Sequence, residues 1–423
     1  MAAITTAVDT AGPTGSEEVH VAPSLPLTTK LKYGAAAYAI TKLIMNPVNF
    51  INGIKTDYFG SSPNKPDVIK AFPSRPQLPV RVFLPKSHSP SNPEHSKEKL
   101  PTLLTIHGGG FVVGSPYDND GWNRRFVQRA EEAGTPFCVI SLDYRKAPSY
   151  PFPTAIHDLK AVILDLLSVS STADHAQKHN DLPVDTNRVA ISGWSAGGNL
   201  AMVVSQLPDI KPLIKAVVPF YPVLDFVTPS ALKCKSRRYK PALGGFRAKD
   251  TDFLMSMAGM FNWSYVSPGT KMSDPLLSPL YALEDYEDEN PWVKGRDNFP
   301  PSVFIVACEL DMLGGEGWRM ACKLAGKKVP GVEEVLGREE PHDFRRNGLL
   351  EFEDEKFHWN ESVDEGNGKK WRYRWLLVPD VVHGYDQDNI GTIMRDEEAV
   401  RDGLEKREKV MEEVRQWLLD GAL

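Results

Sequence analysis

Short apolar runs alternate with helix-like stretches along the chain from about residue 80 onward. Seven runs have the length of a strand and lie at 79–85, 100–107, 136–143, 188–193, 214–222, 302–309 and 374–379. Helical spacing of apolar residues predicts helices at 121–134, 154–168, 314–328 and 396–419. This alternation predicts βαβ units, and therefore an α/β fold with a mostly parallel central sheet flanked by helices.

Two segments interrupt this rhythm. Residues 226–295 are rich in Met, aromatic and Pro residues between two predicted strands, which is typical of a cap over an active site. Residues 330–371 are acidic and are expected to form a solvated insertion. We expect a disordered lead at 1–28, N-terminal cap helices with a connecting segment at 29–79, and a core at 80–423 that carries both insertions.

The composition is that of an ordinary soluble globular protein, with 41% hydrophobic and 25% charged residues. The net charge is −6, and residues 330–371 alone hold 12 acidic and 6 basic residues, so the rest of the chain is close to neutral. A near-neutral surface does not indicate a nucleic-acid partner. The four cysteines show no CxxC spacing, so we expect no metal site.

The first twenty residues have neither the basic flank nor the apolar run of a signal peptide, which predicts a cytoplasmic protein. The longest apolar stretch, 34–54, contains Lys42 and Pro47, which argues against a transmembrane span. We expect it to form an amphipathic helix that covers a pocket or makes weak contact with a membrane. The sequence leaves the oligomeric state open, a dimer included.

Three consecutive glycines follow the second predicted strand, in the motif HGGGFVVGS that begins at His107. Such a loop either cradles a phosphate or directs backbone N–H groups at an oxyanion. The phosphate alternative fits poorly, because the spacing is GxGxxxG rather than GxGxxG and the following SPYDNDG does not resemble a helix start. It also gives His107 no role. The oxyanion interpretation requires a nucleophile elsewhere in the chain.

The motif GWSAG, between an apolar strand and a small-residue helix, predicts that nucleophile at Ser195. Gly193 and Gly197 flank a turn so sharp that Cβ atoms would clash there. The alternative is a helix start that only packs closely on a strand, and the HGGG loop argues against it.

A serine nucleophile needs a base and an orienting acid, in the chain order Ser, acid, His. His383 follows the last predicted strand and precedes the final helix, which makes it the candidate base. Glu309 and Asp311 both lie at the C-terminal end of a predicted strand, where side chains face the ligand crevice of an α/β sheet. The residues alone leave the acid open between these two.

These motifs together resemble the hormone-sensitive-lipase-like esterases, the α/β-hydrolase branch with an HGGG loop. The resemblance spans about residues 80–420 and runs through HGGG at 107–110, DYRKAPSYPFPTAIHD at 143–158, GWSAGGN at 193–199, YPVLDF at 221–226, SDPLLSPLYA at 273–282, ELDML at 309–313 and HGYD at 383–386. It implies an α/β-hydrolase fold whose helical cap is formed by residues 29–54 and 226–295.

The resemblance also implies a role for each candidate residue. Ser195 would be the nucleophile, His383 the base and Asp311, rather than Glu309, the acid. The N–H groups of Gly109, Gly110 and Ala196 would form the oxyanion hole. His107 and Gly108 would support the loop, with His107 as a hydrogen-bonded brace.

The chain departs from the family pattern at several points, none of which removes a triad residue. Trp194 precedes the nucleophile where many members carry Asp, and HGYD replaces HGFD. The 72 residues from Asp311 to His383 form a long interval that contains the acidic insertion. The family-matching Asp158 and Asp225 are expected to be structural.

We expect a serine hydrolase that cleaves a short-chain acyl ester of a small apolar or aromatic metabolite, with no cofactor and no metal. The candidate pocket residues are Phe111, Trp194, Met257, Phe261 and Trp263. The chain resembles fungal members of the family, some of which act in secondary metabolism. The alternatives are an amidase or arylformamidase, a non-hydrolytic enzyme that reuses the oxyanion hole for cyclisation or condensation, and a catalytically silent ligand-binding module.

Overall fold

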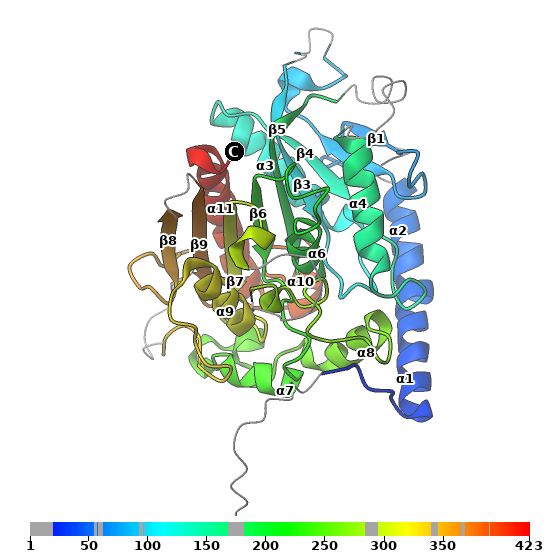
Figure 1. Ribbon diagram of the computed structural model, residues 1–423, viewed down its shortest axis with the longest axis vertical. Coiled ribbons are helices and arrows are strands. Elements are labelled where there is room, and N and C mark those ends of the chain that lie inside the picture. Colours follow the sequence, from blue (N-terminus) through cyan, green and yellow to red (C-terminus); the bar gives the residue numbers. More distant parts are fainter. Residues whose placement is uncertain are drawn as a thin grey trace, which may run out of the picture.

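The computed structural model describes residues 20–54, 57, 62–92, 96, 98–167, 182–283, 295–339, 346–364, 369–388 and 390–423. These residues form a sheet with the strand order β1-β2-β4-β3-β5-β6-β7-β9-β8 (Figure 1). The strands are β1 (Val68–Lys70), β2 (Val80–Phe83), β3 (Leu100–Ile106), β4 (Cys138–Leu142), β5 (Val184–Trp194), β6 (Ala216–Phe220), β7 (Ser302–Cys308), β8 (His358–Asp364) and β9 (Lys370–Val378). All seven predicted strands lie in this sheet.

The six strands from β4 to β9 in the sheet order pair in parallel, and β1, β2 and β8 are antiparallel at the edges. Strands β3 to β7 are buried along most of their length, since helices cover both faces of the sheet. The carboxyl ends of parallel strands meet at one edge of a sheet, so the loops that follow β3, β5, β7 and β9 converge there.

Helices cover the sheet in two layers (Figure 1). Side chains of α4 (Thr154–Leu166), α6 (Ala196–Val204) and α9 (Gly314–Ala325) join one apolar core cluster. Side chains of α3 (Asp120–Glu132) and α11 (Glu397–Trp417) join a second cluster on the other face. The other described helices outside the cap are α10 (Ile390–Met394) and the short helices η3 (Lys86–His88), η4 (Pro116–Asn119), η8 (Pro279–Tyr281), η9 (Gly295–Asn298) and η10 (Leu418–Ala422).

A long helical rod packs against α8 at one side of the molecule (Figure 1). It consists of α1 (Leu27–Tyr38), the π-helical η1 (Ala39–Met45) and α2 (Asn46–Gly53). Pro47 stands in the first turn of α2, directly after the π-helical η1, and the helical backbone continues through it, so the proline does not end the rod. None of the helices in the described part of the chain combines the length and the hydrophobicity that a membrane span requires.

The segment after β6 supplies the rest of the cap. It holds α7 (Ser230–Lys233), η5 (Cys234–Ser236), η6 (Pro241–Leu243), η7 (Gly245–Ala248) and α8 (Met255–Tyr265). The rod and the insertion contact each other through Tyr33 of α1 and Trp263 of α8, whose ring centroids are 6.1 Å apart. Two segments far apart in the chain therefore form one cap.

The expected boundaries are wrong at the N-terminal side. The predicted disordered lead, 1–28, includes residues 20–28, which are ordered in the structure: Val21 forms a β-bridge with Lys271, and α1 begins at Leu27. Residues 1–19 lie outside the described residues. The sheet also begins before residue 80, because β1 pairs with β2.

The acidic segment 330–371 is more than the predicted solvated insertion. It supplies β8, which pairs with β9 along seven residues and forms one edge of the sheet. Phe357 and Trp359 of this segment are buried in the core, and Trp359 directly faces Trp375 of β9. Alternating burial along a polar-rich strand is typical of an edge strand with one solvated face.

Candidate active site

Ser195 stands in the sharp turn between β5 and α6, as the GWSAG motif predicted. Its backbone has φ 55° and ψ −115°, a conformation that a non-glycine residue adopts at a cost. A Cβ atom on Gly193 would lie 2.2 Å from the carbonyl oxygen of Gly197, and one on Gly197 would lie 2.2 Å from that of Ile106. Glycine is therefore required on both sides of Ser195, because the helix start approaches the neighbouring strand β3 so closely.

The candidate base and acid meet across the ends of β7 and β9. His383 Nδ1 donates to Asp311 Oδ2 at 2.8 Å, and both side chains are buried. Burial opposes charging of the imidazole, but the Asp311 carboxylate, aided by Asp252 and Asp386, holds the pKa of His383 above its ordinary value. This geometry fixes the ring with Nε2 as the nitrogen left to accept a proton.

The structure separates the two candidate acids. Glu309 accepts from Lys240 Nζ at 2.8 Å and from the N–H of Asp380 at 2.9 Å, so its carboxylate belongs to a buried ion-pair cluster. Asp311, two residues on, is the one that reaches His383. The family-matching Asp158 and Asp225 pair with Arg145 and Arg319, respectively.

The glycine loop follows β3 and folds back on itself. Gly109 and Gly110 have φ values of 107° and 58°, and the carbonyl of Gly109 accepts from the N–H of Val113 at 2.9 Å. A Cβ atom on Gly109 would lie 2.2 Å from the Val113 oxygen, and one on Gly110 would lie 2.5 Å from the Phe261 ring. Only bare backbone fits between the loop's own turn and the cap.

His107 holds the start of this loop from behind. Its Nδ1 donates to the carbonyl of Gly108 at 2.8 Å, and its Nε2 lies 3.0 Å from Asp143 Oδ1. The ring stacks on Tyr144 with 4.6 Å between centroids. Both ring nitrogens are engaged away from the cavity, so His107 is placed to brace the loop.

The expectation that SPYDNDG does not form a helix start is wrong. The 3-10 turn η4 begins at Pro116, and α3 follows from Asp120. Ser115 and Asp118 form a capping box, so an acidic side chain already occupies this helix start. Asp143, the acid that the phosphate alternative would assign to a ribose, is bound by His107 and by Lys146. These carboxylates make the loop a poor phosphate site.

Ser195, His383 and the glycine loop open onto one cavity of about 370 Å³. Its walls are mostly apolar, and Phe111, Met257 and Phe261 of the predicted pocket residues line it. Phe111 is itself held in place by stacking on Tyr265, with 3.7 Å between ring centroids. Met45 of the N-terminal rod, Phe226 and Leu254 also contribute to its apolar part.

Two of the predicted pocket residues have other roles. Trp263 does not line this cavity in the described part of the chain; α8 turns it outward against Tyr33 of α1. Trp194 borders the cavity, but its indole packs between Trp122 and Phe220 and donates to Asp386 Oδ2 at 2.8 Å. The indole is therefore part of the core behind the nucleophile turn.

Sequence reasoning missed three residues around the candidate base. Tyr221 has a positive φ of 36°, lines the cavity, and lies 4.6 Å from the His383 ring between centroids. Its hydroxyl donates to Asp386, which also accepts from Trp194. Asp252 of the cap insertion contacts the loop that carries Asp311. Tyr221 and Asp386 lie within the YPVLDF and HGYD motifs, whereas no local signal marks Asp252.

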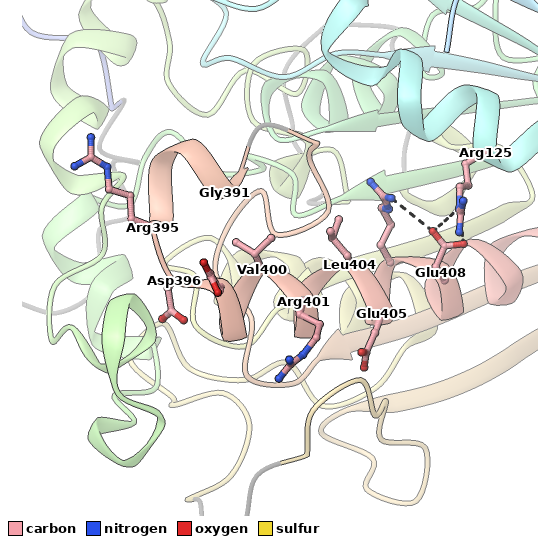
Figure 2. Close-up of a pocket in the computed structure, with 11 residues that line it drawn as sticks. Arg125, Gly391, Arg395, Asp396, Val400, Arg401, Leu404, Glu405 and Glu408 are labelled. Atoms are coloured by element: carbon pink, nitrogen blue, oxygen red, sulfur yellow. Dashed lines mark hydrogen bonds and ion pairs between the residues drawn. The ribbon is translucent and has the colours of Figure 1, made fainter. Parts of the chain in front are cut away.

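A larger depression of about 780 Å³ lies over α10 and α11, away from these residues (Figure 2). Its walls carry many charged side chains, among them Arg395, Arg401 and Glu405, and Arg125 pairs there with Glu408 at 2.8 Å. None of the predicted site residues lines it. Size alone therefore does not make it the candidate active site.

Known proteins match both the sequence and the fold. A family model described as alpha/beta hydrolase fold matches residues 103–346. Because this match covers more than half of the chain, the chain belongs to the α/β-hydrolase fold family. The predicted fold is thereby confirmed.

Several relatives are named for the cleavage of esters or of an arylacetamide. Arylacetamide deacetylase of Oryctolagus cuniculus is 34% identical over 195 residues, which are 45% of this chain and 44% of that protein. Ethyl acetate hydrolase of Pseudomonas putida is 30% identical over 288 residues, which are 64% of this chain and 73% of that protein. The chain thus spans less than half of the deacetylase and about three quarters of the hydrolase.

A solved structure, the Pyrobaculum calidifontis esterase, superposes with a TM-score of 0.54 at 19% identity, covering 93% of this chain and 98% of that one. At this identity the likeness shows the fold alone. By the sequence matches, the chain groups with the carboxylic ester hydrolases of this fold.

Proposed function

We propose that the protein hydrolyses carboxylic esters through an acyl-enzyme, with Ser195 as nucleophile, His383 as base and Asp311 as orienting acid. The observation that carries the proposal is the 2.8 Å bond from His383 Nδ1 to Asp311 Oδ2 at the cavity that Ser195 also lines. The HGGG loop beside it supports assignment to the hormone-sensitive-lipase-like branch.

In the first half of the proposed reaction, His383 Nε2 takes the proton of the Ser195 hydroxyl, and the Ser195 oxygen attacks the ester carbonyl. The bond to the alcohol then breaks, and the imidazolium returns its proton to the leaving alcohol oxygen. In the second half, His383 activates a water that attacks the acyl carbonyl and releases the acid. Asp311 holds the ring in the correct tautomer and stabilises its charge.

The oxyanion that forms on the carbonyl oxygen when Ser195 attacks needs preorganised donors. We assign this role to the backbone N–H groups of Gly109, Gly110 and Ala196. Gly109 and Gly110 border the cavity, and Ala196 is the first residue of α6, whose N-terminal end carries partial positive charge. The positive φ values of the two glycines support the assignment, because they turn the loop backbone at the cavity wall.

The cavity favours a small apolar or aromatic ester with a short acyl group. Its volume of about 370 Å³ is at the lower end of the range for small-molecule sites. Phe111, Phe226 and Phe261 offer aromatic faces, and Met257 offers an adaptable wall.

The experiment that tests this function combines labelling with turnover. Wild-type protein should be labelled by a fluorophosphonate and should hydrolyse p-nitrophenyl esters, with kcat/KM falling as the acyl chain lengthens beyond a few carbons. Ser195→Ala should lose both activities. The proposal is wrong if Ser195→Ala still labels or turns over esters at the wild-type rate. Wild-type inactivity on every acyl length would favour the non-hydrolytic or ligand-binding alternatives.

Amide hydrolysis is a second candidate, which the similarity to arylacetamide deacetylase favours. The same triad serves both reactions, so only substrates separate them. A matched pair, p-nitrophenyl acetate and p-nitroacetanilide, delivers the same acetyl group from oxygen and from nitrogen. A kcat/KM for the anilide within about tenfold of the ester value, a difference of about 1.4 kcal/mol in barrier, would identify an amidase.

We also propose that residues 34–54 make weak contact with a membrane. Leu43 and Phe50 are 66% and 69% exposed on the rod, and Lys42 lies among them. Met45 of the same segment lines the cavity, so the contact would lie beside the cavity. Cosedimentation with anionic vesicles should fall when Leu43 and Phe50 are both changed to Ser; unchanged binding would argue against this contact.

A further inference from the structure

The cap insertion reaches the loop of the candidate acid through one buried ion pair. Arg237 follows η5, and Asp252 precedes α8; Arg237 Nε lies 3.5 Å from Asp252 Oδ2. The two residues are 8% and 4% exposed. Fixing a charged pair in the interior is costly unless each partner makes further hydrogen bonds, and both do here.

This pair contacts the residues on both sides of Asp311. Arg237 Nε donates to the carbonyl of Leu310 at 3.1 Å. Asp252 Oδ2 accepts from the N–H of Met312 at 2.8 Å. One guanidinium and one carboxylate of the cap thus hold the peptide groups before and after Asp311.

The same cap segment also reaches the base. Asp252 Oδ1 accepts from the N–H of Leu254 at 2.8 Å, which fixes the turn that enters α8. The ring of Phe253 meets that of His383 at 6.3 Å between centroids, and Leu254 lines the cavity. Three consecutive residues, 252–254, therefore touch the acid loop, the base and the cavity in turn.

We propose that Arg237 and Asp252 are positioning residues that hold Asp311 in register with His383 and so make the triad depend on the cap. The proposal rests on the proposed function, because it assigns Asp311 its role as acid. The core alone supplies Asp311 with bonds from the N–H of Leu313 to its Oδ1 and from the N–H of Gly314 to its carbonyl. The core also holds Leu310, whose N–H donates to the carbonyl of Val381 at 3.0 Å. The cap pair adds one further contact on each side of Asp311.

Charge gives this arrangement a second consequence. The carboxylates of Asp311, Asp252 and Asp386 all favour the imidazolium of His383, against the opposing effect of burial. Arg237 partly offsets Asp252. The other titratable groups near these carboxylates include Tyr221, Tyr385 and Arg407 around Asp386, and the thiols of Cys234 and Cys308. Replacing the Asp252 carboxylate by an amide removes one negative charge, so the pKa of His383 should fall.

The test is the pH profile of ester hydrolysis by Asp252→Asn, alone and combined with Asp311→Asn. Asp252→Asn should lower kcat by about tenfold, the scale for a lost supporting contact, and should move the acidic limb of kcat/KM to lower pH. In the Asp311→Asn background the same change should cost little more, because Asp252 acts through Asp311. Arg237→Lys, which retains the charge but not the fork, should show a smaller loss of kcat than Arg237→Met.

Asp402→Asn provides a matched control, because Asp402 pairs with Arg247 of the same insertion at 3.0 Å and is equally buried, but away from the triad. It should lower the melting temperature and leave the acidic limb in place. The inference fails if Asp252→Asn costs the same factor with and without Asp311, or if its pH profile matches that of Asp402→Asn. If Asp252→Asn does not fold, the two Arg237 variants test the same inference. Equal kcat values for Arg237→Lys and Arg237→Met would overturn the inference. If Asp311→Asn alone retains wild-type kcat, the proposed function fails instead.

Discussion

Replacing Gly109 by alanine should remove most of the turnover while leaving the fold intact. Gly109 has a φ of 107°, and an added Cβ atom would lie 2.2 Å from the carbonyl oxygen of Val113. Ordinary van der Waals contact begins near 3.4 Å, and backbone cannot swing aside as a long side chain can. The loop between Gly109 and Val113 must therefore move by about 1 Å or change its turn.

A displacement of this size decides whether an oxyanion donor works. Such donors act at about 2.7–3.1 Å from the oxyanion, so a shift of about 1 Å breaks the hydrogen bond. Loss of one donor typically costs about 10²–10³ in kcat, or about 2.7–4 kcal/mol. We expect kcat of Gly109→Ala to fall by this factor and KM to change by less than about threefold, since the donor acts mainly on the transition state.

The assay is steady-state hydrolysis of p-nitrophenyl butyrate together with thermal unfolding. Gly134→Ala is the matched control, because Gly134 also has a positive φ, 71°, but nothing lies within 4 Å of its added Cβ atom. Both variants should lose about 1–2 kcal/mol of stability from the left-handed backbone. Only Gly109→Ala should lose kcat. A Gly109→Ala enzyme with kcat within threefold of wild type would refute the role assigned to the loop.

Three further changes test other parts of the site. Asp311→Asn should lower kcat by about 10⁴. It should also move the acidic limb of kcat/KM to lower pH, because the Asp311 carboxylate raises the pKa of His383; an acidic limb that does not move would contradict the assignment. Phe261→Ala enlarges the cavity, so hexanoyl esters should gain relative to acetyl esters in kcat/KM, whereas an unchanged ratio would show that the acyl group binds elsewhere. Trp263→Ala removes the ring contact with Tyr33, so the melting temperature should fall while kcat/KM for small esters stays unchanged. A raised KM would show that Trp263 contacts the substrate after all.

Much of the fold could be predicted because parallel strands buried on both faces are continuous apolar runs. All seven strands expected on that basis are present, and the helices between them begin and end within a few residues of the prediction. The missed strands are the antiparallel edges β1 and β8. Each is short or polar on one face, so its stability comes from pairing with a neighbour rather than from a local apolar pattern.

The triad candidates could be predicted because each follows a strand of recognisable type. The orientation of α8 could not be predicted. Apolar residues occur on all sides of this helix, so its sequence does not show that Phe261 faces the cavity and that Trp263 faces the rod. Asp252 could not be found either, since its contacts with Met312 join segments 60 residues apart. The fungal character, the role in secondary metabolism and the cytoplasmic location stay predictions.

The acidic segment has a consequence for how the protein behaves at high concentration. Without β8, the sheet would end at β9, a long strand with mostly buried side chains. The unpaired backbone N–H and C=O groups along its edge could then pair with a strand of another chain. β8 covers that edge and ends the sheet with a strand whose exposed positions are Asn360, Ser362 and Asp364. A polar edge strand of this kind discourages edge-to-edge pairing with another sheet. The segment that interrupts the hydrolase pattern is therefore the one that should keep the protein from aggregating through its sheet.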